Sequence, residues 1–121
     1  SDANIRYLRY AEVLLMKAEA MNELGQTGAA LPFLNQVRNR AGLANSTAVS
    51  QADVRTAIWK ERRLELALEH DRWFDLIRTG QAVTAMAADG KTFVAGKNEV
   101  FPIPSSFIAE AKGLSIQNAN Y

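Results

Sequence analysis

The stretch from Trp59 to Arg78 constrains the fold of this chain more than any other segment. On a helical wheel its apolar side chains fall into two sectors instead of one, so a helix made from it must be enclosed on several sides. The first sector holds Trp59, Leu66, Trp73 and Ile77, and the second holds Leu64 and Leu68. The sequence therefore predicts a central helix through this stretch, packed inside a bundle of helices.

A line of four charged residues, Arg62, Glu65, Glu69 and Arg72, runs between those two sectors. Neighbours three or four positions apart on a helix touch, so the spacing pairs Arg62 with Glu65 and Glu69 with Arg72. Because buried charges are found paired, we interpret the four as a partly buried structural ion network. The alternative is that the two glutamates form an acid/base pair or a metal site. A helical di-metal site needs Glu-x-x-His, and His70 does not have that spacing from either glutamate.

Composition limits the function classes. The 121 residues are enough for one domain with its own core, which we expect to span residues 1–121. No cysteine is present, so disulfides, thiolate metal sites and thiol nucleophiles are excluded. A net charge of +1 makes nucleic acid an improbable partner, and no motif predicts a cofactor or a metal. No apolar run is long enough to predict a membrane span, and the N-terminus has no export signal.

Two helices are predicted before the central one. The first covers about residues 5–24, with Leu8 and Ala11 on its apolar stripe, and Gly25 ends it. The second covers about residues 28–40 and stops at Gly42. Ala18 and Ala30 occupy the small positions of a tetratricopeptide-like hairpin, in which two antiparallel helices touch through alanine. One such hairpin cannot cover its own apolar face, so we expect it to rest on the central helix.

The C-terminal third is predicted to be rich in loops. Residues 83–88 form a short helix before the Asp89-Gly90 turn. The two prolines of the segment Phe101-Pro102-Ile103-Pro104 hold it extended, and we expect Phe101 and Ile103 to point inward. A last helix covers residues 107–112. The predicted fold is all-α: a helical bundle with a tetratricopeptide-like hairpin and a loop-rich C-terminal segment.

Three ordered motifs of this chain resemble the SusD/RagB family. They are RYAEVLLMKAEAMNELG at 9–25, LNQVRNRAGL at 34–43, and the series Glu61-Arg62, Glu65-Leu66, Glu69, Arg72-Trp73-Phe74-Asp75-Leu76 and Arg78. The PIP segment and the terminal QN-x-x-Y are also similar to the end of these proteins. The family pattern carries a glycine just after the last glutamate, where this chain has His70 and Asp71.

The resemblance implies a non-catalytic function. SusD/RagB proteins are outer-membrane, surface-exposed lipoproteins of Bacteroidetes-type uptake systems. They bind a glycan or another nutrient and work with a SusC-like TonB-dependent transporter. The family's length implies that this chain is the C-terminal part of such a protein, with the lipid anchor upstream, and holds much of the scaffold and little of the ligand pocket. We assign no ligand-binding residue, and we expect the excised segment to expose apolar surface and to form a homo-oligomer through it.

Two alternatives from other classes remain. The first is a free-standing helical adaptor that binds peptides in a repeat-like groove, although the sequence shows a single such hairpin. The second is an enzyme with His70 and Asp75 as base and orienter, but five residues apart on a helix they point in different directions. Trp59 and Trp73 lie in the apolar sector, which predicts core residues instead of a sugar-stacking platform.

Overall fold

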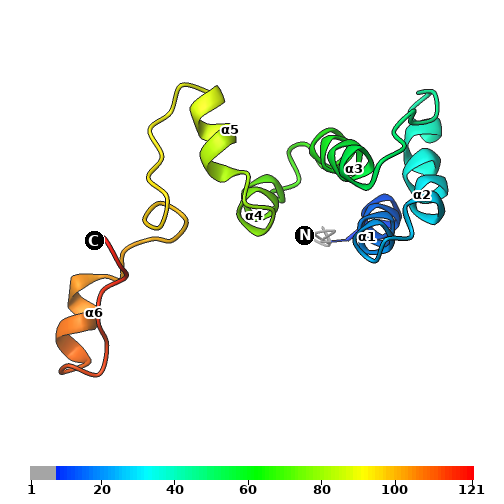
Figure 1. Ribbon diagram of the computed structural model, residues 1–121. Helices are drawn as coiled ribbons and strands as arrows, with labels where there is room; N and C mark the ends of the chain where they lie inside the picture. The colour runs from blue at the N-terminus through cyan, green and yellow to red at the C-terminus, as the bar shows by residue number, and fades with distance from the viewer. Residues whose placement is uncertain (1–7) are drawn as a thin grey trace, which may run out of the picture. The chain divides into compact units, whose positions relative to one another are not determined.

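The computed structural model describes residues 8–121, and all regular elements within that range are helices (Figure 1). They are α1 (Tyr10–Glu23), α2 (Thr27–Arg40), α3 (Gln51–Glu65), α4 (Arg72–Arg78), α5 (Ala82–Ala88) and α6 (Ser105–Glu110). The all-α prediction is confirmed. The predicted start of the first helix at residue 5 lies outside the described residues, and α1 begins at Tyr10.

The chain divides into two units, Ser1–Asp71 and Arg72–Tyr121. The first contains α1, α2 and α3, and the second contains α4, α5 and α6. Each unit is described by itself below. The assignment of residues 1–121 to a single domain stays a prediction.

The first unit is built on the predicted helix hairpin. Ala18 of α1 and Ala30 of α2 are both 0% exposed, so the two helices approach each other through small side chains. Gly25 and Gly42 follow α1 and α2 with φ of +77° and +76°, the left-handed conformation in which a glycine ends a helix. One apolar cluster joins all three helices: Leu14, Leu15, Ala18, Ala30, Leu34, Val37, Val54 and Ile58.

The hairpin rests on α3, as predicted. Asn22 donates from Nδ2 to the backbone oxygen of Gln51 at 2.9 Å, and Gln51 donates from Nε2 to the backbone oxygen of Asn22 at 2.6 Å. These reciprocal bonds join the end of α1 to the start of α3. The start of α3 is also fixed locally, because the Ser50 hydroxyl accepts from the backbone N–H of Asp53 at 3.1 Å.

The central helix ends earlier than the sequence pattern indicated. α3 stops at Glu65, and a turn precedes α4, which starts at Arg72. Within this turn Leu68 and His70 have φ of +68° and +65°. The prediction of a helix through the whole stretch to Arg78 is therefore wrong. The second apolar sector does not form, since Leu64 is 59% exposed and Leu68 is 98% exposed.

His70 stands in a left-handed conformation at the position where the SusD/RagB pattern carries a glycine. A side chain at such a φ costs roughly 1–2 kcal/mol, which glycine avoids at the expense of a more flexible unfolded chain. His70→Gly is therefore expected to raise the free energy of unfolding by about 0.5–1 kcal/mol, measured by urea denaturation. Ala67→Gly is the matched control, because Ala67 has no positive φ, and it should destabilise the chain instead. Equal effects of the two variants would contradict the prediction.

In the second unit α4 is followed by α5, and Trp73 of α4 packs edge-on against Phe93 with ring centroids 6.0 Å apart. Gln117 binds both backbone groups of Ile103, accepting from its N–H at 2.8 Å and donating to its oxygen at 2.9 Å. These two bonds join the C-terminal residues to the segment Phe101-Pro102-Ile103-Pro104. Of the two side chains predicted to point inward, Ile103 is half-buried but Phe101 is 86% exposed. Asn118 donates from Nδ2 to the backbone oxygen of Phe101 at 2.7 Å and leaves its ring in solvent. α6 starts at Ser105, directly after Pro104, and not at residue 107.

Candidate functional site

Two arginines and two glutamates, Arg9, Arg40, Glu65 and Glu69, form a cluster at the C-terminal end of α3, here called the arginine–glutamate cluster. Arg9 binds Glu65 through Nη1 at 2.6 Å and Glu69 through Nε at 2.7 Å. Arg40 binds Glu65 through Nη2 at 2.6 Å. Arg9 precedes α1 and Arg40 ends α2, so the cluster ties both hairpin helices to the end of α3.

The position of Glu65 explains why two guanidiniums are needed. Its side chain is 7% exposed and stands at a helix C-terminus, where the helix dipole disfavours a negative charge. Burial alone raises the pKa of the Glu65 carboxyl, but the hydrogen bonds from Arg9 and Arg40 outweigh burial and hold that pKa below its usual range. Arg9 also donates from Nη2 to the backbone oxygen of Glu65, one of the carbonyls that the end of α3 leaves unpaired.

The structure shows partners for these charged residues that lie outside the central stretch. Glu65 is bound by Arg9, directly before α1, and by Arg40 at the end of α2. Arg62 itself is 4% exposed and lies 2.9 Å from Asp71 and 3.8 Å from Glu12. Asp71 lies beyond the end of α3, so its ion pair with Arg62 links the helix to the turn that follows it.

Arg72 belongs to the second unit, where its Nη1 lies 4.0 Å from Asp75. Glu69, predicted as its partner, accepts from Arg9. The grouping of Arg62, Glu65, Glu69 and Arg72 into one structural network stays a prediction.

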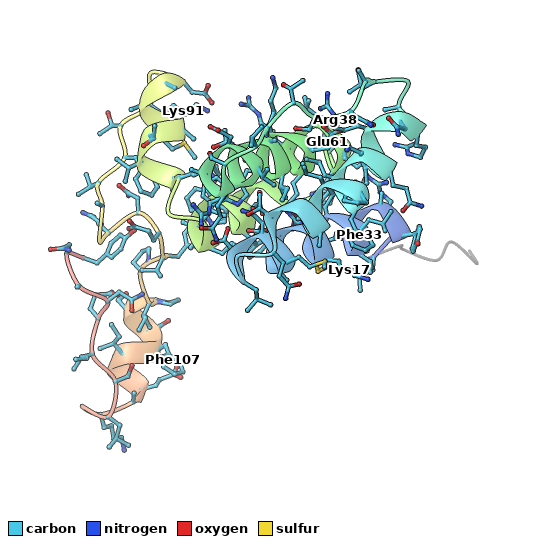
Figure 2. The ribbon with its side chains drawn as sticks, turned by 45° about the vertical axis from the view of Figure 1, so that its right-hand side comes forward. Lys17, Phe33, Arg38, Glu61, Lys91 and Phe107 are labelled. Carbon is cyan, nitrogen blue, oxygen red and sulfur yellow. The ribbon has the colours of Figure 1, made fainter. Side chains whose placement is uncertain are left out.

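A second ion pair, between Arg38 of α2 and Glu61 of α3, stabilises the start of the loop that joins these helices (Figure 2). Arg38 Nη1 lies 2.9 Å from the carboxylate of Glu61, whose side chain is 4% exposed. Arg38 Nε also donates to the backbone oxygen of Ala44 at 3.0 Å. The buried charge of Glu61 is therefore neutralised by a residue that also fixes the chain leaving α2.

The residues that the alternatives named for catalysis or sugar stacking lie in different environments. His70 is exposed, and Asp75 is 2% exposed with its Oδ1 accepting from Arg78 at 2.7 Å. Trp59 and Trp73, predicted as core, are half-buried, and the indole N–H of Trp59 donates to Glu19 at 3.0 Å. Within residues 8–121 no three His, Cys, Asp or Glu side chains gather as a metal site would require.

A hollow of about 340 Å³ lies between α1 and α2. Its lining residues are Arg9, Tyr10, Ala11, Leu14, Gln36, Val37 and Arg40. Ala11, Leu14 and Val37 give it an apolar lining, and its two arginines are bound to Glu65. The hollow therefore suits an apolar group better than an anion.

Sequence reasoning missed Arg9 and Arg40 as partners of the glutamates. Both are far from Glu65 in sequence, and helical spacing reports only neighbours on the same helix. The signal that could have found them is their place in the family-like motifs, since Arg9 opens RYAEVLLM and Arg40 stands in RNRAGL.

The fold and the ion pairs define a class: an all-α, repeat-like protein in which ion pairs join the helices. Residues 1–121 match the profile of the SusD family over their whole length, and the chain belongs to that family. It is 31% identical to SusD-like protein P2 of Formosa agariphila over 134 aligned positions, covering 100% of this chain and 26% of that protein.

Two solved structures are similar. Surface glycan-binding protein A from Bacteroides thetaiotaomicron superposes with a TM-score of 0.82 at 35% identity, over 99% of this chain and 25% of that one. A laminarin-binding SusD-like protein gives 0.75 at 44% identity, over 94% of this chain and 22% of that one. The chain thus spans about a quarter of the length of these relatives. Among residues 8–121 there is no helix with the length and apolar character to cross a membrane.

Proposed function

We propose that this chain is the scaffold part of a non-catalytic, glycan-binding SusD-like protein on the outer-membrane surface. In this proposal the protein works with a SusC-like TonB-dependent transporter, and the glycan is held mostly by segments outside these residues. The observation that carries the proposal is the match of the whole chain to the SusD family. The ion pairs support the scaffold part, because the carboxylates of Glu61 and Glu65 are bound by arginines.

The class of glycan is inferred from the solved relatives. One is described as laminarin-binding, and surface glycan-binding protein A is known in complex with laminarihexaose. Laminarin and its oligosaccharides are therefore the first ligands to test. The adaptor alternative has no comparable support.

Calorimetric titration of the 121-residue chain with laminarihexaose tests whether most of the ligand pocket lies outside these residues. We expect binding at least roughly 100-fold weaker than that of surface glycan-binding protein A in the same assay, because most of the pocket is absent; this corresponds to about 2.7 kcal/mol. We also expect no release of reducing ends from laminarin. Binding as tight as that of the relative would place the pocket in this chain. Hydrolysis that is lost in His70→Ala would support the enzyme alternative.

The transporter partnership is tested separately. The chain, carrying an affinity tag, is expected to retain a SusC-like TonB-dependent transporter from detergent-solubilised outer membranes of its own organism. A porin from the same membranes serves as the control for non-specific retention. Recovery of the transporter no better than that of the porin would remove the partnership from the proposal.

A further inference from the structure

The backbone of residues 96–103 forms neither helix nor strand, so its polar groups need partners from elsewhere in the chain. Pro102 adds to this need, because it fixes its own φ and carries no N–H for a regular ladder. The partners are side chains of residues 117–121, here called the strap, and the two segments lie side by side (Figure 1). The strap therefore binds the segment mainly through the segment's backbone.

Gln117 acts towards Ile103 as a neighbouring peptide group would. A side-chain amide carries an acceptor and a donor, so it can bind the N–H and the carbonyl oxygen of one residue together. The same Oε1 atom also accepts from the backbone N–H of Asn118 at 2.9 Å, which fixes the position of the amide. Gln117 thus anchors the strap at the end of the segment that leads into α6.

The rest of the strap binds three further carbonyl groups of the segment. The donors and acceptors are Asn118 Nδ2 to Phe101 at 2.7 Å, Asn120 Nδ2 to Gly96 at 3.0 Å and the Tyr121 hydroxyl to Val100 at 2.8 Å. A turn in the strap, in which the N–H of Tyr121 donates to the oxygen of Asn118 at 3.3 Å, gives these side chains their spacing. Asn120 has a φ of +69°, which asparagine adopts more readily than most residues.

One side chain of the segment also contacts the strap. The Lys97 ammonium lies 4.9 Å from the centre of the Tyr121 ring, within the range of a cation–π interaction. Lys97 is half-buried, whereas Lys91, which precedes the segment and follows α5, is exposed (Figure 2). The chain around Lys97 is therefore restrained by the strap, and the chain around Lys91 is not part of these contacts.

We propose that the strap is a conformational device that keeps residues 96–103 in one conformation, whatever side chains the segment carries. Backbone carbonyls are the same in every residue, so the bonds to them do not select the segment's sequence. Val100 and Phe101 are 49% and 86% exposed, so their side chains add little burial to the contact. When the strap leaves, the segment loses these bonds together and opens locally, while α4 and α5 of the same unit stay folded. The inference does not depend on the proposed glycan binding.

Limited proteolysis with trypsin tests the proposal, because Lys97 lies inside the segment and Lys91 outside it. The initial rate of cleavage after each lysine is measured by mass spectrometry on the 121-residue chain, before any second cut. In Gln117→Ala, which removes both bonds to Ile103, we expect cleavage after Lys97 to be about tenfold faster, corresponding to about 1.4 kcal/mol. Cleavage after Lys91 should change by less than about twofold, because it follows a different local opening.

Two control variants separate the strap from the segment's own side chains. Ala119→Gln changes an exposed residue of the strap and should leave both rates as in the wild type. The double variant Val100→Thr with Phe101→Gln changes two exposed side chains of the segment but none of the backbone groups that the strap binds. It should also leave cleavage after Lys97 within about twofold of the wild type.

Three outcomes would overturn the proposal. The first is an unchanged rate after Lys97 in Gln117→Ala. The second is equal acceleration after Lys91 and Lys97, which would mean that the unit unfolds as a whole and that the strap controls no local opening. The third is acceleration by the double variant as large as that of Gln117→Ala, which would mean that the segment is held by its own side chains.

Discussion

Glu65→Ala is expected to lower the free energy of unfolding by about 2 kcal/mol, because it leaves the charges of Arg9 and Arg40 without their shared partner. Removing one member of a fully buried ion pair costs roughly 3–5 kcal/mol. The smaller value applies here because the Arg9 and Arg40 side chains are 32% and 63% exposed, so water solvates them in part. Urea denaturation of both proteins at neutral pH measures the difference.

Arg63→Ala is the matched control, since Arg63 is an exposed residue of the same helix, and it should change stability by less than about 0.5 kcal/mol. The pH dependence adds a second readout. The pKa of Glu65 is lowered in the folded state, so its stabilisation is complete above the pKa of the unfolded chain and is lost as the pH falls through the folded value. The gap between wild type and Glu65→Ala should therefore narrow on acidification below about pH 4.5. A gap that is constant with pH would mean that packing, and not charge, explains the loss.

The hairpin was predictable because its signals are local. The three- and four-residue spacing of Leu15, Ala18, Leu34 and Val37 places them on facing stripes, and all four are buried. Gly25, Gly42 and Ser50 mark helix ends through backbone geometry and a side-chain cap, and each acts where the sequence predicted it. Signals of this kind need no knowledge of distant residues.

The end of α3 and the partners of its glutamates were not predictable in the same way. Helical periodicity continues without a break from Trp59 to Arg78, and no glycine or proline interrupts it. The break falls at Leu68 and His70, which adopt a conformation that their own side chains disfavour. The convergence of Arg9 and Arg40 on Glu65 is a tertiary contact between three helices, which no spacing within one helix encodes.

Ala30→Leu is expected to have the largest effect of these substitutions, lowering the free energy of unfolding by about 3 kcal/mol. Ala30 is 0% exposed and belongs to the same buried cluster as Ala18 and Leu34. Three added carbon atoms cannot fit there unless α1 and α2 move apart, and separation would also loosen their shared contacts with Ile58 of α3. Urea denaturation followed by far-UV circular dichroism measures the loss.

The neighbouring residue provides a stringent control. Ala29 lies on the same helix but is exposed, and leucine and alanine have similar helix propensities, so Ala29→Leu should leave stability within about 0.5 kcal/mol of the wild type. The comparison therefore isolates packing between the two helices from any change in helix formation. If Ala30→Leu were as stable as Ala29→Leu, the two helices would not be held together through small residues. The hairpin would then resemble a tetratricopeptide unit in its sequence but not in the packing of its two helices.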